Sequence, residues 1–162
     1  MSGPQTPRRK ARRRAFQVLY GFEFEPPVND RALAKAVAEA PEDPGVAESS
    51  EAGKPYVMEL VSGVWNGRDE LDALVQQHSQ NWKLARIAKV ELTILRLALY
   101  EILHVDDIPL RVALNEAVEL AKEFGDENSP GFVNGILDAV AKAVDQGKFA
   151  MKKDLSKNKE EA

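Results

Sequence analysis

The chain has 162 residues, enough for one domain with a sizeable core, and 30% of them are charged while 7% are aromatic. It contains no cysteine and only two histidines, which excludes disulfides, thiol catalysis, and thiolate or histidine-rich metal sites. The net charge of −4 hides an asymmetry: six of the 22 basic residues lie in residues 1–14, which leaves 16 against all 26 acidic residues. A basic end on an acidic body is typical of a protein with an anionic partner. No apolar signal segment follows the basic start, so a cytoplasmic location is expected.

The basic start is predicted to form a helix over residues 8–24, preceded by disorder over residues 1–7, with Thr6-Pro7 as the cap and first turn. Cations near the positive N-terminal end of a helix dipole are unfavourable for the helix. Six of them in these turns break this local rule, which indicates a binding role. Gln17 and Tyr20 would follow with hydrogen bonding and base stacking. Six phosphate contacts would give a salt slope of about −0.7 × 6, or roughly −4. The ordinary alternative is a solvated basic tail.

A second helix is predicted over residues 31–40, because Pro26-Pro27 ends the first helix and Asn29 or Asp30 can cap the next one. Residues 41–54 are acidic, contain two glycines and two prolines, and have almost no large apolar residue. This composition predicts a flexible acidic loop.

A third helix is predicted to start at Pro55. Asn66-Gly67 can end it, but the apolar period resumes afterwards, so a continuous helix to about His78 fits equally well. His78 is expected to be structural. Trp82 is expected to be a packing anchor between two subdomains.

Residues 88–103 contain no glycine or proline and are apolar around most of a helical circumference. This pattern predicts a central buried helix at about 89–104. It is too short and too often interrupted by charge to span a membrane. One narrow polar stripe crosses the helix at Thr93, Arg96, Tyr100 and His104. Arg96 is expected to be a structural residue that pairs with a carboxylate.

A helix over residues 110–124 is expected to end at Gly125, and Ser129-Pro130 is expected to cap and begin the last helix, which runs to about residue 144. Gly135 within that last helix is expected to permit close helix packing. A flexible lysine-rich tail is expected over residues 147–162.

These elements predict an all-α, compact bundle of about seven helices in two subdomains, near residues 8–80 and 81–146. There is no phosphate-cradling glycine loop and no nucleophile elbow, and no convincing acid–base pair can be named. The sequence therefore predicts a binding module without a cofactor rather than an enzyme.

Four motifs follow one another along the chain. They are Arg8-Arg9-Lys10-Ala11-Arg12 with Ala15-Phe16-Gln17-Val18-Leu19-Tyr20, Trp82 and Arg86 with Val90-Glu91 and Ile94–Glu101, Ile108-Pro109 with Val112–Lys122, and Phe132–Asp138. In this order they resemble the NusB family of bacterial transcription antitermination factors, over about residues 8–142.

The resemblance implies an all-α fold and a role in ribosomal RNA transcription. It implies that the protein pairs with the small-subunit ribosomal protein NusE and that this pair binds the single-stranded boxA element of nascent RNA. It also implies that the pair joins a complex with RNA polymerase, which then reads through terminators. The implied RNA-binding residues are Arg8, Arg9, Arg12, Arg13, Gln17, Tyr20, Lys122, Asn128, Ser129 and Phe132. Glu91 is the implied NusE contact, although a glutamate at a helix start also suits the helix dipole. Gly131 stands where family members can carry a basic residue, so one phosphate contact is expected to be missing.

Three alternatives belong to other classes. The first is a helical protein–protein adaptor whose basic helix binds an acidic protein. The second is an enzyme, because a NusB-like domain precedes some ribosomal RNA methyltransferase domains; the glycine-rich loop of such a domain is missing and too few residues follow to form one. The third is a membrane anchor, for which the basic helix has too few large apolar residues. The sequence leaves the oligomeric state open, a homodimer included.

Overall fold

The computed structural model describes residues 7–40, 54–79 and 83–147. These ranges contain seven α-helices, one short 3₁₀-helix and no strand, which confirms the all-α prediction. The predictions for Thr6, for Trp82, and for most of the acidic loop and the tail concern residues outside these ranges. None of the helices in the described part combines the length and apolar character that crossing a bilayer requires.

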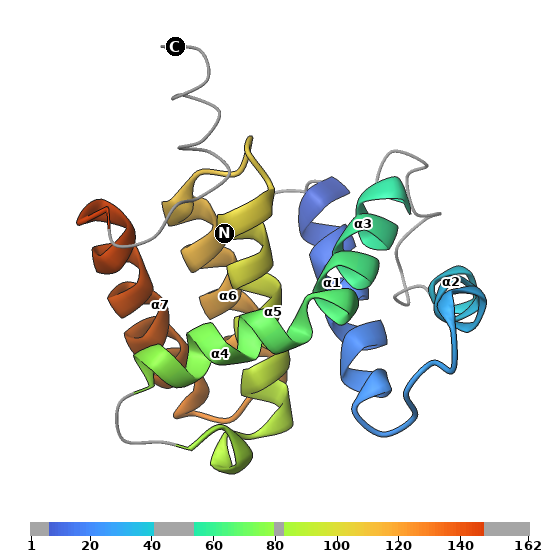
Figure 1. Ribbon diagram of the computed structural model, residues 1–162, viewed down its shortest axis with the longest axis horizontal. Coiled ribbons are helices and arrows are strands. Elements are labelled where there is room, and N and C mark those ends of the chain that lie inside the picture. The colour runs from blue at the N-terminus through green and yellow to red at the C-terminus, as the bar shows by residue number, and fades with distance from the viewer. Residues whose placement is uncertain (1–6, 41–53, 80–82, 148–162) are drawn as a thin grey trace. The chain divides into compact units, whose positions relative to one another are not determined.

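The chain divides into two compact units, and the first, Met1–Asn66, holds three helices. These are α1 (Pro7–Phe22), α2 (Asp30–Glu39) and α3 (Lys54–Asn66), all shown in Figure 1. α1 packs along α3, and α2 contacts both of them. The cap of α2 is Asn29, whose side-chain oxygen accepts a hydrogen bond of 2.8 Å from the backbone N–H of Ala32.

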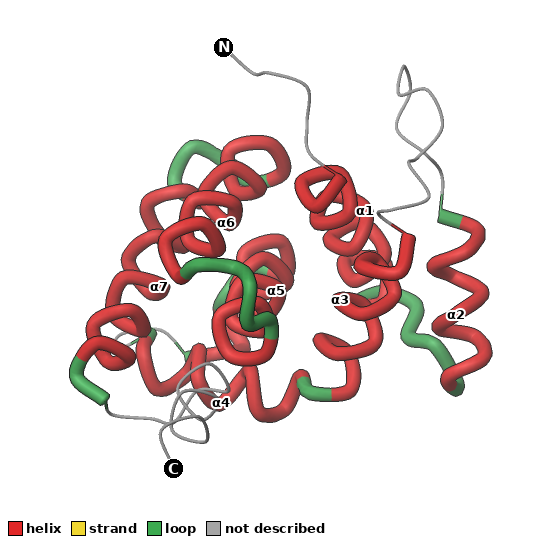
Figure 2. Tube along the Cα trace, turned by 90° about the horizontal axis from the view of Figure 1, so that it is seen from above, coloured by secondary structure: helices red, strands yellow, loops and turns green. Residues whose placement is uncertain are grey.

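The second unit, Gly67–Ala162, is built around α5. It contains α4 (Arg68–His78), the 3₁₀-helix η2 (Leu84–Arg86), α5 (Lys89–His104), α6 (Leu110–Phe124) and α7 (Ser129–Asp145). α5 contacts α4, α6 and α7, and α6 packs along α7 (Figure 2). Eleven of the 16 residues of α5 are buried, as its nearly continuous apolar surface predicts.

The break between α3 and α4 falls at Gly67, so the two shorter helices, and not the continuous one, are present. α4 contacts α5 and α7 and buries Leu71 and Val75. Because α4 packs in this way, the second unit begins at Gly67, earlier than the boundary near residue 81 that the sequence suggested.

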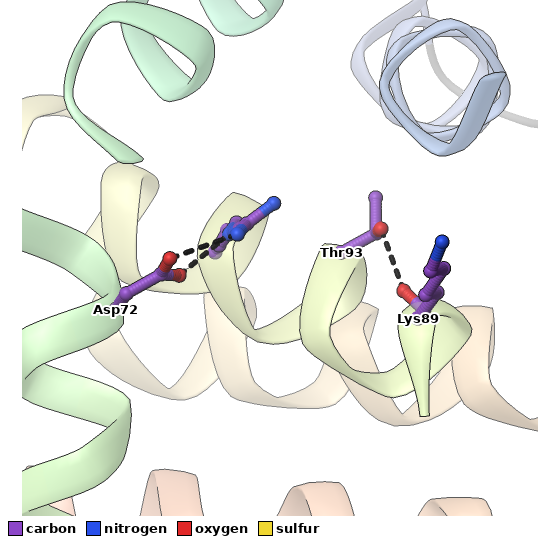
Figure 3. A network of polar contacts seen from close by, with 4 residues as sticks. Asp72, Lys89 and Thr93 are labelled. Carbon is purple, nitrogen blue, oxygen red and sulfur yellow. Dashed lines mark hydrogen bonds and ion pairs between the residues drawn. The ribbon is translucent and has the colours of Figure 1, made fainter. Parts of the chain in front are cut away.

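Two residues of the polar stripe of α5, Thr93 and Arg96, make short hydrogen bonds (Figure 3). Arg96 donates from Nε to Asp72 Oδ1 at 2.6 Å and from Nη2 to Asp72 Oδ2 at 2.8 Å, a two-point pair across α5 and α4. The Thr93 hydroxyl donates to the Lys89 carbonyl at 2.7 Å. The prediction of a structural Arg96 paired with a carboxylate is confirmed.

Two glycines differ in what they do. Gly125 ends α6, as predicted, and a Cβ at this position would collide with the side chain of Ser129. The missing side chain therefore lets α7 start close to the end of α6. Gly135 is exposed on α7, where a Cβ would meet nothing within 4 Å. The prediction that Gly135 permits close helix packing is wrong, because no neighbouring element approaches it.

Candidate nucleic-acid interface

The basic start of α1 is partly packed within the first unit. Pro7 opens the helix, and its first turn has no acidic residue, so the cations that follow oppose the helix dipole. The guanidinium carbon of Arg8 lies 4.5 Å from the centre of the Tyr56 ring on α3, a cation–π contact. Arg12 is only 4% exposed. Residue type alone therefore does not show which cations face a ligand.

Arg14 has a structural partner in α2. Its Nη2 donates to the Ala40 carbonyl at 2.7 Å and reaches the Val37 carbonyl at 3.5 Å. These carbonyls belong to the C-terminal end of α2, where a cation is favoured by the helix dipole. Arg14 therefore joins α1 to the end of α2.

The remaining predicted residues of α1 share one side of the helix. Residues three or four apart lie on one helical face, and Arg9, Arg13, Gln17 and Tyr20 follow that spacing. Arg9, Arg13 and Tyr20 are partly exposed and Gln17 is exposed. We call these four residues the α1 stripe. It places two cations, then an amide, then an aromatic ring in order along the axis.

The aromatic end of the α1 stripe is held by two phenylalanines. The Tyr20 ring stacks on Phe16 with centres 5.8 Å apart, and it meets Phe24 edge-to-face at 5.2 Å. Phe16 is 2% exposed, whereas Phe24 is 63% exposed. Sequence reasoning overlooked Phe24, although its spacing of four from Tyr20 was a usable signal.

A groove of about 710 Å³ runs between α1 and α2 next to the stripe. Gln17 is the stripe residue that lines it, and the charged groups of its lining are Glu25, Glu39 and Lys35. The charged groups of the groove therefore come from α2 and from the segment after α1, and they include more acid than base, in contrast to the α1 stripe.

In the second unit, the start of α7 is organised by Asp126. Its Oδ1 accepts hydrogen bonds from the backbone N–H of Asn128 at 2.8 Å and of Ser129 at 3.2 Å. The Ser129 hydroxyl oxygen in turn accepts from the Asp126 N–H at 3.0 Å. This reciprocal arrangement is a capping box formed by the turn that leads into α7. Asn128 precedes the first helical residue and makes no side-chain cap bond. The prediction that Ser129 caps the helix is wrong, because Ser129 is already the first residue of α7 and its hydroxyl accepts from the Asp126 N–H.

The other predicted residues of this unit differ in exposure. Asn128 and Lys122 are exposed, and Phe132 is partly exposed. Ser129 is 2% exposed. The Lys122 amine lies 3.3 Å from a carboxylate oxygen of Glu119, and an exposed pair of this kind contributes little to stability. Lys122 can therefore exchange this partner for another anion.

Glu91 lies in the first turn of α5 and is partly exposed. Partial burial, and then the negative charge of Asp126, raise the pKa of the Glu91 carboxyl group. The influence of Asp126 places Glu91 within electrostatic reach of the α6–α7 turn. The predicted protein contact and part of the predicted RNA surface thus lie in one region of the second unit.

The predicted residues form two groups, one in each unit. The first unit contains Arg8, Arg9, Arg12, Arg13, Gln17 and Tyr20. The second unit contains Glu91, Lys122, Asn128, Ser129 and Phe132. Sequence reasoning missed the role of Asp126, which reads as an ordinary loop acid. In the described part of the chain no three metal-binding side chains gather into a candidate metal site.

Comparisons with known proteins identify the family of this chain. The model of the NusB family matches residues 9–142. Transcription antitermination protein NusB of Nitratidesulfovibrio vulgaris (strain DSM 19637 / Miyazaki F) is 48% identical over 159 residues, which cover 93% of this chain and 96% of the relative.

Solved structures show the same fold. NusB of T. maritima superimposes with a TM-score of 0.71 at 35% identity, covering 86% of this chain and 93% of that one. A structure of the antitermination factors NusB and NusE in complex with dsRNA has a TM-score of 0.70 at 26% identity, covering 85% and 97%.

Proposed function

This chain belongs to the NusB family of transcription antitermination proteins, and we propose that it binds RNA together with NusE and supports read-through by RNA polymerase. The observation that carries the proposal is the α1 stripe. It presents cations, an amide and an aromatic ring on one face of a helix whose first turn has no acid. The solved relative that contains NusB, NusE and RNA supports the same assignment.

Within the α1 stripe the roles divide by chemistry. Arg9 and Arg13 contact phosphates, Gln17 hydrogen-bonds a base edge, and Tyr20 stacks on a base. Arg8 is held against Tyr56 and adds positive charge beside the stripe. Arg12 is 4% exposed, so it is buried and holds the neighbouring residues of α1 in place.

The second unit supplies a second contact region. Lys122 contacts a phosphate, while Asn128 and Phe132 contact bases. Ser129 acts through the capping box, because its hydroxyl is engaged with Asp126 and the residue is buried. Glu91 contacts NusE from the first turn of α5.

The RNA is the single-stranded boxA element of ribosomal RNA transcripts, read in the cytoplasm. Single strands expose base faces and edges to side chains such as Tyr20 and Gln17, whereas an RNA duplex hides them in its stack. The relative's complex holds dsRNA, so both RNA forms belong in the test.

The test measures binding of a boxA-like single strand, a scrambled strand and a duplex, with and without NusE, across a salt series. Arg12 is buried and Arg14 donates to the end of α2, so we assign phosphate contacts to Arg8, Arg9, Lys10 and Arg13 at the helix start and to Lys122 in the second unit. The expected slope is about −0.7 × 5, or roughly −3.5, and affinity falls about 130-fold between about 50 and 200 mM salt.

Preference for the boxA strand, enhanced by NusE, supports the proposal. A steep slope without sequence preference reduces it to non-specific RNA binding. Absence of RNA binding in every condition overturns it and assigns the basic helix to an acidic protein partner.

A further inference from the structure

The α1 stripe does not end at Tyr20 in the structure. The chain keeps a helical turn past the last α1 residue, because the N–H of Phe24 donates to the Gly21 carbonyl at 3.1 Å and that of Glu25 donates to the same oxygen at 3.0 Å. Phe24 therefore continues the spacing of the stripe, four residues after Tyr20. From Arg9 to Phe24 the stripe is about 22 Å long at the rise of an α-helix.

The Phe24 ring is exposed and held in place at the same time. It is 63% exposed, although burial of a phenylalanine is normally favourable. Its edge-to-face contact with Tyr20, at 5.2 Å and 80°, fixes the ring relative to the stripe. The Tyr20 ring is itself fixed by stacking on Phe16 at 12°. Phe24 is thus the outermost ring of a three-ring ladder anchored in the core.

We propose that Phe24 is an additional RNA contact of this chain, which stacks on a base at the end of the strand that the α1 stripe binds. This inference rests on the proposed function. Glu23 and Glu25 flank Phe24 and disfavour phosphate there, so the contact is to a base face and not to the backbone. The cations of the stripe hold the phosphates that precede this base.

Stacking and phosphate contacts give different signatures in a salt series. A stacked base contributes to affinity without releasing counterions, whereas each phosphate contact adds about 0.7 to the slope for a single strand. Phe24→Ala is therefore expected to weaken binding of a boxA-like single strand by about 5- to 100-fold with an unchanged slope. Phe24→Trp is expected to keep wild-type affinity, and Phe24→Leu to behave like the alanine variant.

The matched control is Val28→Ala. Val28 is 89% exposed in the segment that follows, lies outside the stripe, and is expected to leave affinity within twofold of wild type. Circular dichroism and thermal melting of each variant establish that it is folded. Binding of NusE alone is measured in parallel.

A series of RNA strands, each lacking one base, provides the decisive measurement. On the strand that lacks the stacked base, Phe24→Ala is expected to cause no loss of RNA affinity. This expectation holds whatever position the Tyr20 ring takes in the variant. Three results would each overturn the inference and leave the proposed function intact. They are equal losses of affinity on all strands, a loss confined to NusE binding, and wild-type RNA affinity for Phe24→Ala while Arg9→Ala binds weakly. Failure of the wild-type protein to bind any RNA would overturn both.

Discussion

The starts of α1 and α7 handle the positive end of the helix dipole in opposite ways. At α7, Asp126 accepts from two backbone N–H groups, so a negative side chain compensates the helix end. At α1, the first turn holds no acid and the cations that follow add to the unfavourable field. The α7 start is therefore arranged for stability. The α1 start gives up local stability, and we propose that its positive charge serves an anionic ligand.

The cations of α1 differ among themselves in the same manner. Arg14 donates to carbonyls at the end of α2, which is the favourable place for a cation on a helix. Arg9 and Arg13 are partly exposed on the α1 stripe. The comparison between the two helix starts thus predicts that charge removal has different consequences at neighbouring positions.

The largest expected effect comes from the double variant Arg9→Ala, Arg13→Ala. RNA affinity should fall about 100-fold, since each charge-assisted contact contributes roughly 1.5 kcal/mol. The salt slope should become shallower by about 1.4, at about 0.7 per lost phosphate contact. Binding titrations over a salt series measure both quantities.

Arg14→Met is the matched control for that pair. It should lower the free energy of unfolding by about 1–2 kcal/mol, because carbonyls at the end of α2 lose a charged donor. The RNA salt slope should stay unchanged. If Arg14→Met changes the salt slope as much as the double variant does, the cations of α1 act together as one charge. Arg14 would then not differ in role from Arg9 and Arg13.

Asp126→Ala tests the stabilising helix start. Loss of the capping box should lower the free energy of unfolding by about 1–2 kcal/mol. Asp126→Asn keeps a side-chain acceptor and should lose only a fraction of this. Urea unfolding followed by circular dichroism compares the two. If both variants match wild type, the hydrogen bonds of Asp126 do not stabilise α7.

Gly131→Lys would make the α7 start resemble the α1 start. A Cβ at Gly131 meets nothing within 4 Å, so the side chain fits. The added cation should raise RNA affinity about threefold in moderate salt and steepen the slope by about 0.7. Gly131→Ala brings the same gain in helix propensity without charge, and should leave the slope unchanged. An equal gain in both variants would attribute the effect to helix order.

The sequence was informative wherever a regular pattern determined the structure. The apolar surface of residues 88–103 predicted a buried helix, and the position of Arg96 on its polar stripe predicted a pair with a carboxylate, which the structure shows to be Asp72. The candidate residues of α1 followed from charge and spacing. Chemistry alone did not separate Arg14 from Arg13, because the difference lies in whether α2 ends nearby.

Tertiary and loop geometry account for the remaining differences. Gly67 was compatible with a break or a continuous helix, and packing of α4 on α5 accompanies the break. Ser129-Pro130 suggested a cap at serine, but Ser129 is the first residue of α7, and Asp126 accepts from the N–H groups of Asn128 and Ser129 in the preceding turn. Phe24 was the last residue of the helix predicted over residues 8–24 and was not considered as a site residue, although the ring contacts place it beside Tyr20.

The smallest expected effect concerns Glu91, where α5 begins beside the Asp126 carboxylate. Partial burial and then Asp126 raise the pKa of Glu91 above its ordinary value of 4.5, so the ionised form is less favourable in the folded state than in the unfolded state. Below about pH 4.5 the group is protonated in both states and has no effect on stability. As the pH rises through the raised folded value, the wild-type protein loses stability relative to Glu91→Gln.

Glu91→Gln should therefore be slightly more stable than wild type at pH 7, and this advantage should disappear below about pH 4.5. Thermal melting across a pH series measures it. In an Asp126→Asn background the advantage should shrink, because the second cause of the raised pKa is removed while the cap is retained. A Gln variant that is less stable at pH 7 would mean that the dipole of α5 stabilises the Glu91 charge more than burial and Asp126 oppose it. The start of α5 would then belong with that of α7, where an acid serves stability alone.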